Sequence, residues 1–289
     1  MQDDEDIEEF ELPISFEFFP PKTEAGFTRL AEVRDRLAVQ EPGFFSVTYG
    51  AGGSTRERTF RAVKMVRECG IETAPHLSCV GHARAEIRDI LDTYKADGIR
   101  RIVALRGDLP SGMGPTSGEL SYARDLVEFI RTQYGDHFRI EVAAYPEMHP
   151  QAASLDADIA NFVAKARAGA NAAITQYFYN PDAYFHFMDR VLDEGIDIPI
   201  VPGIMPITNV ANLVRFSDGC GAEVPRWLRK QLESYANDEE SLRLFGIEVV
   251  SSLCDTLITA GAPGLHFYTM NQAEPTLAIL RNLGMPVVD

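Results

Sequence analysis

The sequence has few of the features on which secreted, membrane or zinc proteins depend. Its four cysteines lie far apart and form no CxxC pair. That spacing favours reduced thiols over a disulfide framework or a structural zinc site. No run approaches the roughly 18 apolar residues of a membrane span, and the first residues have neither the basic nor the apolar part of a signal peptide. We therefore expect a cytoplasmic protein.

Basic residues are also scarce. Lysine and arginine together number 27 against 43 aspartates and glutamates, which gives a net charge of −16. A surface this acidic repels nucleic-acid phosphates and anionic lipid headgroups, so we expect neither nucleic acid nor membrane as a partner. Acidic residues are concentrated at the start of the chain, where residues 1–12 are predicted to form a solvated tail of open function.

The signatures of several enzyme classes are missing as well. The first apolar run has no HxH pattern, and HExxH does not occur, which argues against a metallohydrolase and against any metal site. The five lysines all fall outside the apolar runs, which disfavours a Schiff-base aldolase. A cofactor-free lyase is disfavoured on the same grounds.

What the sequence does contain is a regular alternation of two kinds of segment. Eight nearly continuous apolar runs are predicted as strands buried on both faces, at 14–19, 44–50, 72–79, 101–108, 140–147, 171–178, 198–206 and 264–271. Segments with helical spacing occupy 25–37, 57–69, 85–95, 120–133, 156–168, 182–194 and 274–283. Several of them end in glycine, as helix C-termini often do.

This rhythm predicts an α/β protein with the (β/α)₈ TIM-barrel fold. Repeated βα units give a parallel sheet, and eight of them at this length suggest a closed barrel over residues 13–289 as one catalytic domain. A doubly wound open sheet is the alternative. The longer interval at 207–263 is predicted to add two helices, at 224–235 and 238–260.

Polar side chains gather at the predicted carboxyl ends of the strands, where barrel enzymes build their active sites. They include Glu17, Thr48, Tyr49, His76, Arg106, Asp108, Tyr145, Glu147, His149, Gln176, Tyr268 and Asn271. Any one of them has an ordinary structural explanation, such as a hydrogen-bonded core histidine. Together, on an apolar frame, they indicate a site, because burying so many polar groups costs stability.

Glu17 is the leading catalytic candidate. It stands between Phe16 and Phe18. A carboxylate near aromatic walls is expected to have a raised pKa and to serve as a general acid near neutral pH. A structural ion pair with Arg106 or another cation is the alternative.

Eight segments, in order along the chain, resemble methylenetetrahydrofolate reductases of the compact bacterial, flavin-dependent form. They are SFEFFPPKT, FFSVTYGAGGSTRERT, APHLSC, GIRRIVALRGDLP, VAAYPEMHP, AGANAAITQYFYN, VPGIMPITN and HFYTMNQAE. They extend from Ser15 almost to the end of the chain, and several are long and unusual.

The resemblance implies a (β/α)₈ barrel that binds FAD and works by a ping-pong mechanism. NADH or NADPH reduces the flavin and leaves, and 5,10-methylenetetrahydrofolate is then reduced to 5-methyltetrahydrofolate in one-carbon metabolism and methionine biosynthesis. A homo-oligomer is also implied, and only the catalytic domain is expected. The sequence has no ribose-phosphate fingerprint that separates NADH from NADPH.

The resemblance also implies roles for individual residues. Glu17 matches the acid that protonates a folate nitrogen, and Asp108 matches a catalytic residue beside both flavin and folate. Substrate binding is implied for Glu17, Asp108, Gln176, Asn212, Phe216 and Gln272. Flavin binding is implied for Thr48, Tyr49, Ala51, His76, Arg106, Gly107, Asp108, Tyr122, Ala123, Tyr145, His149, Asp158, Asn161 and Lys165, of which Arg106 and Lys165 suit a pyrophosphate.

Three positions depart from the family pattern. The family usually has arginine where Gln272 stands, some members have glutamine in place of Asn212, and Ala164 replaces a basic flavin contact. These differences concern ligand affinity rather than the reaction. A flavin-free reductase of the same fold and a folate- or flavin-binding barrel without catalysis are the alternative functions, and the presence of Glu17, Asp108 and Gln176 argues against the second.

Replacing Gln272 with arginine is expected to tighten folate binding, because a guanidinium would restore a partner for a carboxylate of the substrate. The dissociation constant of methyltetrahydrofolate, measured by titration of Gln272→Arg and of the wild type, checks this. Equal affinities would remove position 272 from the substrate site.

Overall fold

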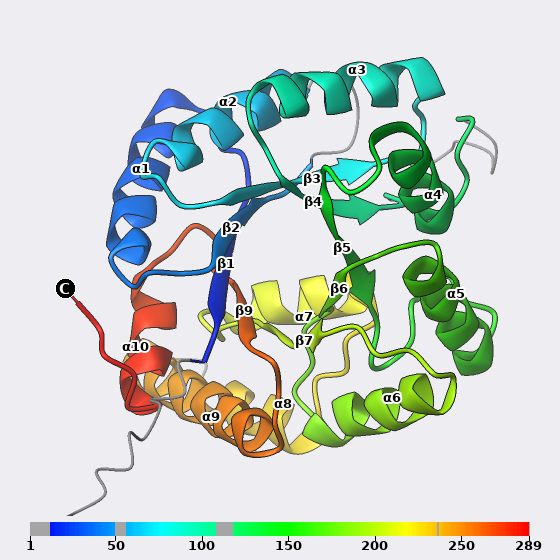
Figure 1. The fold of residues 1–289 in the computed structure, drawn as a ribbon. Coiled ribbons are helices and arrows are strands. Elements are labelled where there is room, and N and C mark those ends of the chain that lie inside the picture. The colour runs from blue at the N-terminus through cyan, green and yellow to red at the C-terminus, as the bar shows by residue number, and fades with distance from the viewer. Residues whose placement is uncertain (1–11, 50–55, 108–117, 236, 289) are drawn as a thin grey trace, which may run out of the picture.

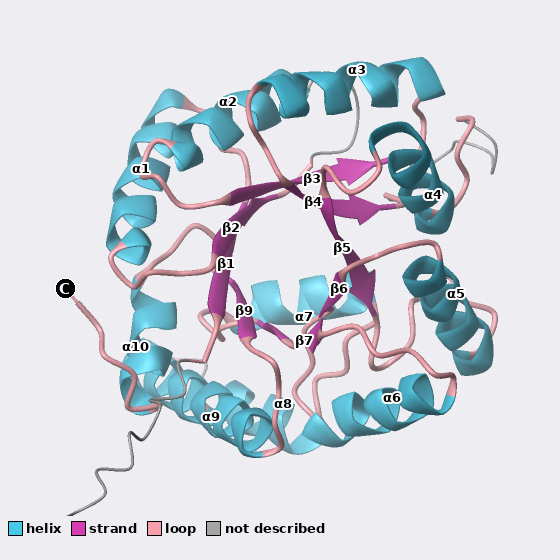
Figure 2. Cartoon of the chain, in the orientation of Figure 1, coloured by secondary structure: helices cyan, strands magenta, loops and turns pink. Residues whose placement is uncertain are grey.

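A computed structural model describes residues 12–49, 56–107, 118–235 and 237–288. Its described residues form one sheet of nine parallel strands inside a ring of helices (Figures 1 and 2). The strands are β1 (Ile14–Phe18), β2 (Phe44–Val47), β3 (Thr73–Ser78), β4 (Arg101–Leu105), β5 (Arg139–Ala144), β6 (Ala172–Thr175), β7 (Ile200–Val201), β8 (Gly203–Ile204) and β9 (Leu265–Tyr268). The predicted (β/α)₈ barrel is confirmed. The predicted tail lies almost wholly outside the described residues.

Among the described residues, one helix follows each of the first six strands, and three helices lie between β8 and β9. The helices are α1 (Glu24–Ala38), α2 (Arg56–Arg67), α3 (Arg84–Ala96), α4 (Ala123–Tyr134), α5 (Leu155–Arg167), α6 (Pro181–Asp193), α7 (Val210–Cys220), α8 (Arg226–Ser234), α9 (Glu239–Thr259) and α10 (Glu274–Asn282). Several begin at a side-chain cap, as where Thr23 accepts the N–H of Gly26 at 3.1 Å. Within the described chain, no helix combines the length and apolar character that crossing a membrane requires.

The seventh barrel strand is divided, which corrects the prediction of one continuous strand at 198–206. Pro202 has no N–H to continue the ladder, so β7 pairs with β6 and β8 pairs with β9. The sheet order runs from β7 through β6, β5, β4, β3, β2, β1 and β9 to β8. The strands β7 and β8 stand at the two ends of this order, and only Pro202 lies between them in the chain. The divided strand therefore joins the two ends of the sheet and closes the barrel.

Gly203 is required at this junction. A Cβ there would lie 2.2 Å from the carbonyl oxygen of Thr175 and 2.7 Å from the hydroxyl of Tyr268. The N–H of Gly203 also donates to Oγ1 of Thr175 at 2.9 Å. The backbone of the seventh strand therefore approaches β6 and β9 more closely than any side chain would permit.

The pleat of the strands separates two apolar regions. Phe16 and Phe18 of β1 are fully buried in the main core, where both pack on the ring of Phe45. A second cluster of Phe44, Ala74, Val103 and Ile174 forms separately. Because alternate strand residues point to opposite faces, the first group faces the helices and the second fills the barrel interior.

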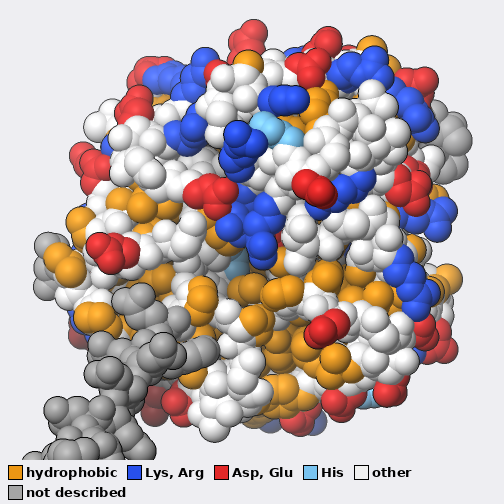
Figure 3. All heavy atoms as spheres, viewed as in Figure 1, with side chains coloured by type: hydrophobic (Ala, Val, Ile, Leu, Met, Phe, Trp, Pro, Cys, Tyr) orange, Lys and Arg blue, Asp and Glu red, His pale blue; other side chains and the backbone are white. Residues whose placement is uncertain are grey.

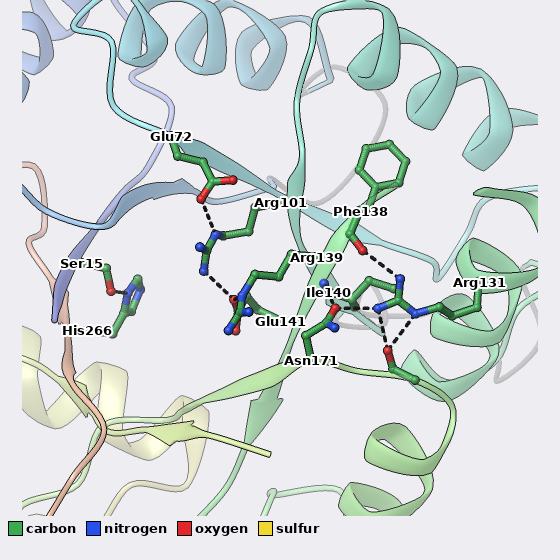
Figure 4. A network of polar contacts seen from close by, with 11 residues as sticks. Ser15, Glu72, Arg101, Arg131, Phe138, Arg139, Ile140, Glu141, Asn171 and His266 are labelled. Carbon is green, nitrogen blue, oxygen red and sulfur yellow. Dashed lines mark hydrogen bonds and ion pairs between the residues drawn. The ribbon is translucent and has the colours of Figure 1, made fainter. Parts of the chain in front are cut away.

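The barrel interior is ionic at the amino-terminal ends of the strands. Arg101 of β4 donates to Glu72 and to Glu141 of β5, both at 2.8 Å, and Arg139 donates to the same Glu141 oxygen at 3.1 Å. Figure 4 shows these side chains within the ring of strands. In the space-filling view, Lys and Arg side chains gather at the centre of this face (Figure 3). Glu141 is nearly fully buried and needs these cations.

Replacing Arg101 with methionine is expected to lower the free energy of unfolding by about 2–4 kcal/mol, because it leaves buried Glu141 with one partly exposed cation. Urea-induced unfolding measures the difference. Arg139→Met is the matched control, with an expected cost below about 1 kcal/mol because the Arg139 side chain is half-exposed. A cost for Arg101→Met no larger than that of the control would contradict this account.

Candidate active site

A cavity of about 390 Å³ opens at the carboxyl ends of the strands. Its lining comes from residues at or just beyond these ends and from α7, which Figure 1 shows inside the ring of helices. The lining residues are Glu17, Thr48, Tyr49, His76, Val103, Leu105, Ala143, Tyr145, Ile174, Gln176, Tyr177, Met205, Phe216, Cys220, Tyr268 and Met270. The position is the one at which barrel enzymes place their chemistry.

Glu17 lies between two buried histidines. Its Oε2 atom is 3.3 Å from Nε2 of His76 on β3 and 3.8 Å from Nε2 of His266 on β9. The first contact has the distance of an ion pair without the alignment of a hydrogen bond, so Nε2 of His76 is buried with no hydrogen-bond partner among the described residues. A carboxylate and two imidazoles from three strands therefore lie together, and Glu17 and His76 line the cavity.

His266, the fully buried member of this cluster, is held by several contacts. Its Nδ1 lies 2.7 Å from Oγ of Ser15, and its Nε2 lies 3.4 Å from Oγ of Ser46. Its ring stacks on Phe44 with centroids 5.7 Å apart. Figure 4 shows Ser15 and His266 side by side on neighbouring strands. The imidazole has contacts at both nitrogens, which restricts its orientation.

The environment of Glu17 corrects the expectation of a raised pKa. Phe16 and Phe18 point away from Glu17, because neighbouring strand residues alternate between the two faces of the sheet. Burial is the largest single influence and raises the pKa of Glu17, but the nearby imidazoles of His266 and His76 favour the charged carboxylate and together outweigh it. The resulting pKa is about 2, so Glu17 is ionised in the ligand-free cavity. Among the described residues, only these two histidines lower the pKa of Glu17, so the alternative of a structural pair with Arg106 gains no support.

Gln176 and Phe216 come from different elements and both line the cavity. Gln176 follows β6, and its Oε1 accepts the N–H of Tyr177 at 3.0 Å. This bond does not use the amide nitrogen of Gln176. Phe216 lies on α7 with the guanidinium of Arg215 5.0 Å from its ring centroid. The structure therefore brings a carboxylate, an amide and an aromatic ring to the lining of one cavity.

Arg106 and Gly107 follow β4 beside the cavity. Gly107 has a φ of +87°, and a Cβ there would lie 1.8 Å from Oγ of Ser78, so only glycine fits. The guanidinium of Arg106 donates to Oε1 of Gln151 and to the carbonyl of Gly107. This loop presents a cation and bare backbone at the rim, as a phosphate group requires.

A second polar group lies between β5 and α5. Lys165 donates to the carbonyl of Ala143, and its ammonium is 5.9 Å from the ring centroid of Tyr145. Burial lowers the pKa of Lys165 to about 8, although nearby Asp158 opposes the shift. Asp158 accepts the N–H of His149 at 2.8 Å, and the ring of His149 packs edge-on against Tyr145. These four residues form one connected unit.

The structure does not bring every predicted site residue into the cavity. Tyr122 and Ala123 lie at the start of α4, and Tyr122 is half-exposed. Asn161 is exposed on α5, and Asn212 is exposed on α7, where it accepts from Arg215. Gln272 lines a separate cleft between α7, α9 and α10. Ala51 and Asp108 lie outside the described residues.

His266 and the residues that hold it were missed by reasoning from the sequence. The signal was present, since His266 is two residues before Tyr268 and so lies on the same face of the last strand. Tyr268 itself was noted as a polar strand end but not as a cavity residue. Its hydroxyl donates to the carbonyl of Thr175 at 2.6 Å and joins β9 to β6. Among the described residues, no cluster of three or more His, Cys, Asp and Glu side chains is arranged to hold a metal ion.

Comparison with known proteins agrees with the segments quoted from the sequence. The sequence model described as methylenetetrahydrofolate reductase matches residues 4–284, nearly the whole chain. The chain belongs to the methylenetetrahydrofolate reductase family.

Bacterial members of the family are similar over almost their whole length. The 5,10-methylenetetrahydrofolate reductase of Salmonella typhimurium is 43% identical over 276 residues, which cover 95% of this chain and 92% of that protein. The Escherichia coli enzyme of the same name is 41% identical with the same coverage. A rice protein named probable methylenetetrahydrofolate reductase (NADH) is 40% identical, and the match covers 94% of this chain but 48% of that protein.

A solved structure agrees with the fold. It is an uncharacterized protein from Clostridium thermocellum that binds two copies of 5-methyl-5,6,7,8-tetrahydrofolic acid. It superposes with a TM-score of 0.68, covers 95% of this chain and 96% of its own, and is 17% identical. At that identity the likeness concerns the barrel architecture alone.

The lowered pKa of Glu17 predicts a pH-dependent contribution to stability. The ionised carboxylate favours the folded state above pH 4.5, and this contribution is lost as pH falls from 4.5 to about 2. The free energy of unfolding of the wild type, relative to that of Glu17→Gln, is therefore expected to decrease on acidification through this window. Urea unfolding of both proteins at several pH values measures the difference, and a difference that stays constant or grows would refute the lowered pKa.

Proposed function

We propose that this protein reduces 5,10-methylenetetrahydrofolate to 5-methyltetrahydrofolate with FAD as cofactor and NADH or NADPH as electron donor. The observation that carries the proposal is the carboxylate of Glu17, which faces an open cavity between two buried histidines in a chain of this family. We place the reaction in the cytoplasm, as expected from the sequence, and in a homo-oligomer, as the resemblance implies.

The cavity suits the flat ring system of a flavin. Its floor is apolar, with Val103, Leu105 and Ile174, and its rim carries Thr48 and Tyr49. The buried Nε2 of His76 lacks a hydrogen-bond partner among the described residues. A buried polar atom without a partner is costly unless a ligand satisfies it. This fits a ring that carries both apolar faces and polar edges.

The rest of a dinucleotide would extend from the cavity toward α4 and α5. The proposed partners of the two phosphates are Arg106, which follows β4, and Lys165, whose ammonium lies 5.9 Å from the ring centroid of Tyr145. Proposed contacts beyond them come from Tyr122, Ala123, His149, Asp158 and Asn161, and the proposed roles of Ala51 and Asp108 rest on the family resemblance. The chemistry supplied by a bound flavin is transfer of a hydride from NADH or NADPH to the folate carbon.

Glu17 carries out the proton step in this proposal. Its carboxylate is ionised in the ligand-free cavity, and the imidazoles of His76 and His266 are the adjacent groups able to pass it a proton. A folate ring in the cavity would displace water from Glu17. Burial already is the largest influence raising its pKa, so binding favours its protonation. The carboxyl group then protonates the bridge nitrogen and opens the bridge to an iminium.

Gln176 and Phe216 are the proposed substrate contacts inside the cavity. Both residues line the cavity, where the amide of Gln176 would donate to the polar edge of a pterin and the ring of Phe216 would stack on a substrate ring. A nicotinamide needs the same stacking wall, which supports use of the cavity by the two substrates in turn. Asn212 and Gln272 lie outside this lining and would contact only a more distant part of the folate.

The printed names of relatives bear on the electron donor. The plant relatives are named as NADH enzymes, whereas the bacterial names specify no donor. Both donors therefore stay in the proposal. A flavin-free reductase would purify without visible flavin absorbance, and a non-catalytic folate-binding barrel would bind methyltetrahydrofolate without turnover.

Replacing Glu17 with glutamine is expected to leave the reduction of the flavin by NADH nearly unchanged and to slow folate reduction by at least about 100-fold. The reason is that glutamine keeps the shape of the side chain but cannot deliver a proton. Stopped-flow absorbance of the flavin measures each half-reaction separately.

Ser46→Ala is the matched control, since it alters a neighbour of His266 without removing the acid. We expect folate reduction in this variant to stay within about tenfold of the wild type. Equal losses in both half-reactions of Glu17→Gln would show a structural role for Glu17 and refute its assignment as the acid.

A further inference from the structure

The position of Phe216 depends on how α7 is held over the cavity. One face of α7 packs on the protein, where Leu213 and Ser217 are buried and Val210, Phe216 and Cys220 are partly buried against the core. Packing along a single face leaves the helix room to pivot about that face. Polar contacts near its carboxyl end therefore help to set where the ring of Phe216 lies.

One contact reaches α7 from the loop after β6. The hydroxyl of Tyr177 lies 3.0 Å from Oγ of Ser217, and both residues are buried. Ser217 is adjacent to Phe216 in the chain, so this bond fixes the middle of the helix. Tyr177 follows Gln176 directly and ties the helix to a residue of the cavity.

A second contact reaches α7 from the loop after β5. Oε2 of Glu147 accepts the backbone N–H of Glu223 at 2.7 Å, two residues beyond the C-cap Gly221. Glu147 is half-buried. Burial raises its pKa to about 7, although its bond to Glu223 opposes the shift. The proposed chemistry uses neither Glu147 nor Glu223.

The backbone around this contact is tightly constrained. Met148 has a φ of +93°, which residues with a side chain rarely adopt. Gly221 has a φ of +78°, and a Cβ there would lie 2.9 Å from Cγ of Pro150 and 3.2 Å from the carbonyl oxygen of Met148. The loop after β5 and the end of α7 thus approach each other closely at Gly221.

We propose that Glu147 is a positioning residue, which clamps the carboxyl end of α7 to the loop after β5 and so holds Phe216 over the cavity for the substrate ring. The proposal rests on the proposed function for the identity of that ring. Glu147 acts through α7, while the bond from Tyr177 to Ser217 supplies the second point of attachment. Two points along a helix determine its orientation, whereas one permits it to pivot.

Hydrogen exchange in the ligand-free protein tests the clamp directly. In Glu147→Ala, amide exchange in a peptide spanning 210–223 is expected to accelerate about tenfold, while α1 exchanges as in the wild type. Glu147→Gln keeps an acceptor oxygen and is expected to restore slow exchange. Glu223→Gln is the matched control, because it removes a charge but leaves the backbone donor in place. Unchanged exchange in Glu147→Ala overturns the proposal.

A double-mutant cycle tests the connection to Phe216. Glu147→Ala is expected to raise the KM for methylenetetrahydrofolate about tenfold, with a smaller effect on kcat. In a Phe216→Leu background the same change should have almost no further effect on KM, since the ring that Glu147 positions is gone. Fully additive effects overturn the proposal.

A replacement variant and a ligand-free measurement keep a failure of the clamp distinct from a failure of the proposed function. Glu147→Met replaces Glu147→Ala if the alanine variant does not fold, because methionine fills a similar volume without a strong acceptor. The exchange measurement requires neither flavin nor folate. A wild type that fails to reduce methylenetetrahydrofolate therefore refutes the proposed function alone, whereas normal exchange in α7 of the variants refutes the clamp alone.

Discussion

The contact of Glu17 with His76 and His266 is the interaction around which the half of the barrel nearest the carboxyl ends of the strands is organised. Three strands must be in register for it to form, since β1 supplies the carboxylate and β3 and β9 supply the imidazoles. Further bonds maintain that register. Thr269 donates to the carbonyl of Glu17 at 2.6 Å, and His266 is held by Ser15. The same bonds that close the barrel thus set the electrostatic environment of the acid.

The interior of the barrel changes in character along its axis. Ion pairs around Glu141 occupy the amino-terminal end, an apolar cluster around Phe44 fills the middle, and the Glu17 cluster faces the cavity. The apolar layer separates two charged layers, and in such a low-dielectric region each charge depends on its immediate neighbours. The ion pairs around Glu141 are enclosed within the barrel, whereas Glu17 and His76 line the cavity, where the proposed proton transfer would take place.

Much of the fold was predictable, because buried strands and amphipathic helices leave periodic patterns in the residues themselves. The division of the seventh strand was not predicted, although Pro202 and Gly203 were visible, since its effect depends on β6 and β9 as partners. Glu17 was found from its position at a strand end. Its pKa was expected to rise because Phe16 and Phe18 adjoin it in sequence, but the pleat of the strand directs these rings to the opposite face. His266, distant in sequence, determines the outcome instead.

By itself, the sequence determined the parallel barrel and the family, and it singled out Glu17 at the carboxyl ends of the strands as the candidate acid. These follow from local periodicity and from motifs that need no partner to be recognised. The tertiary structure alone decided that Glu17 is ionised when no ligand is bound, that Gln272 lies in a separate cleft, and that Glu147 reaches the end of α7. Each of these depends on groups far apart in the chain, and electrostatic and packing energies depend on distances in space rather than on order along the sequence.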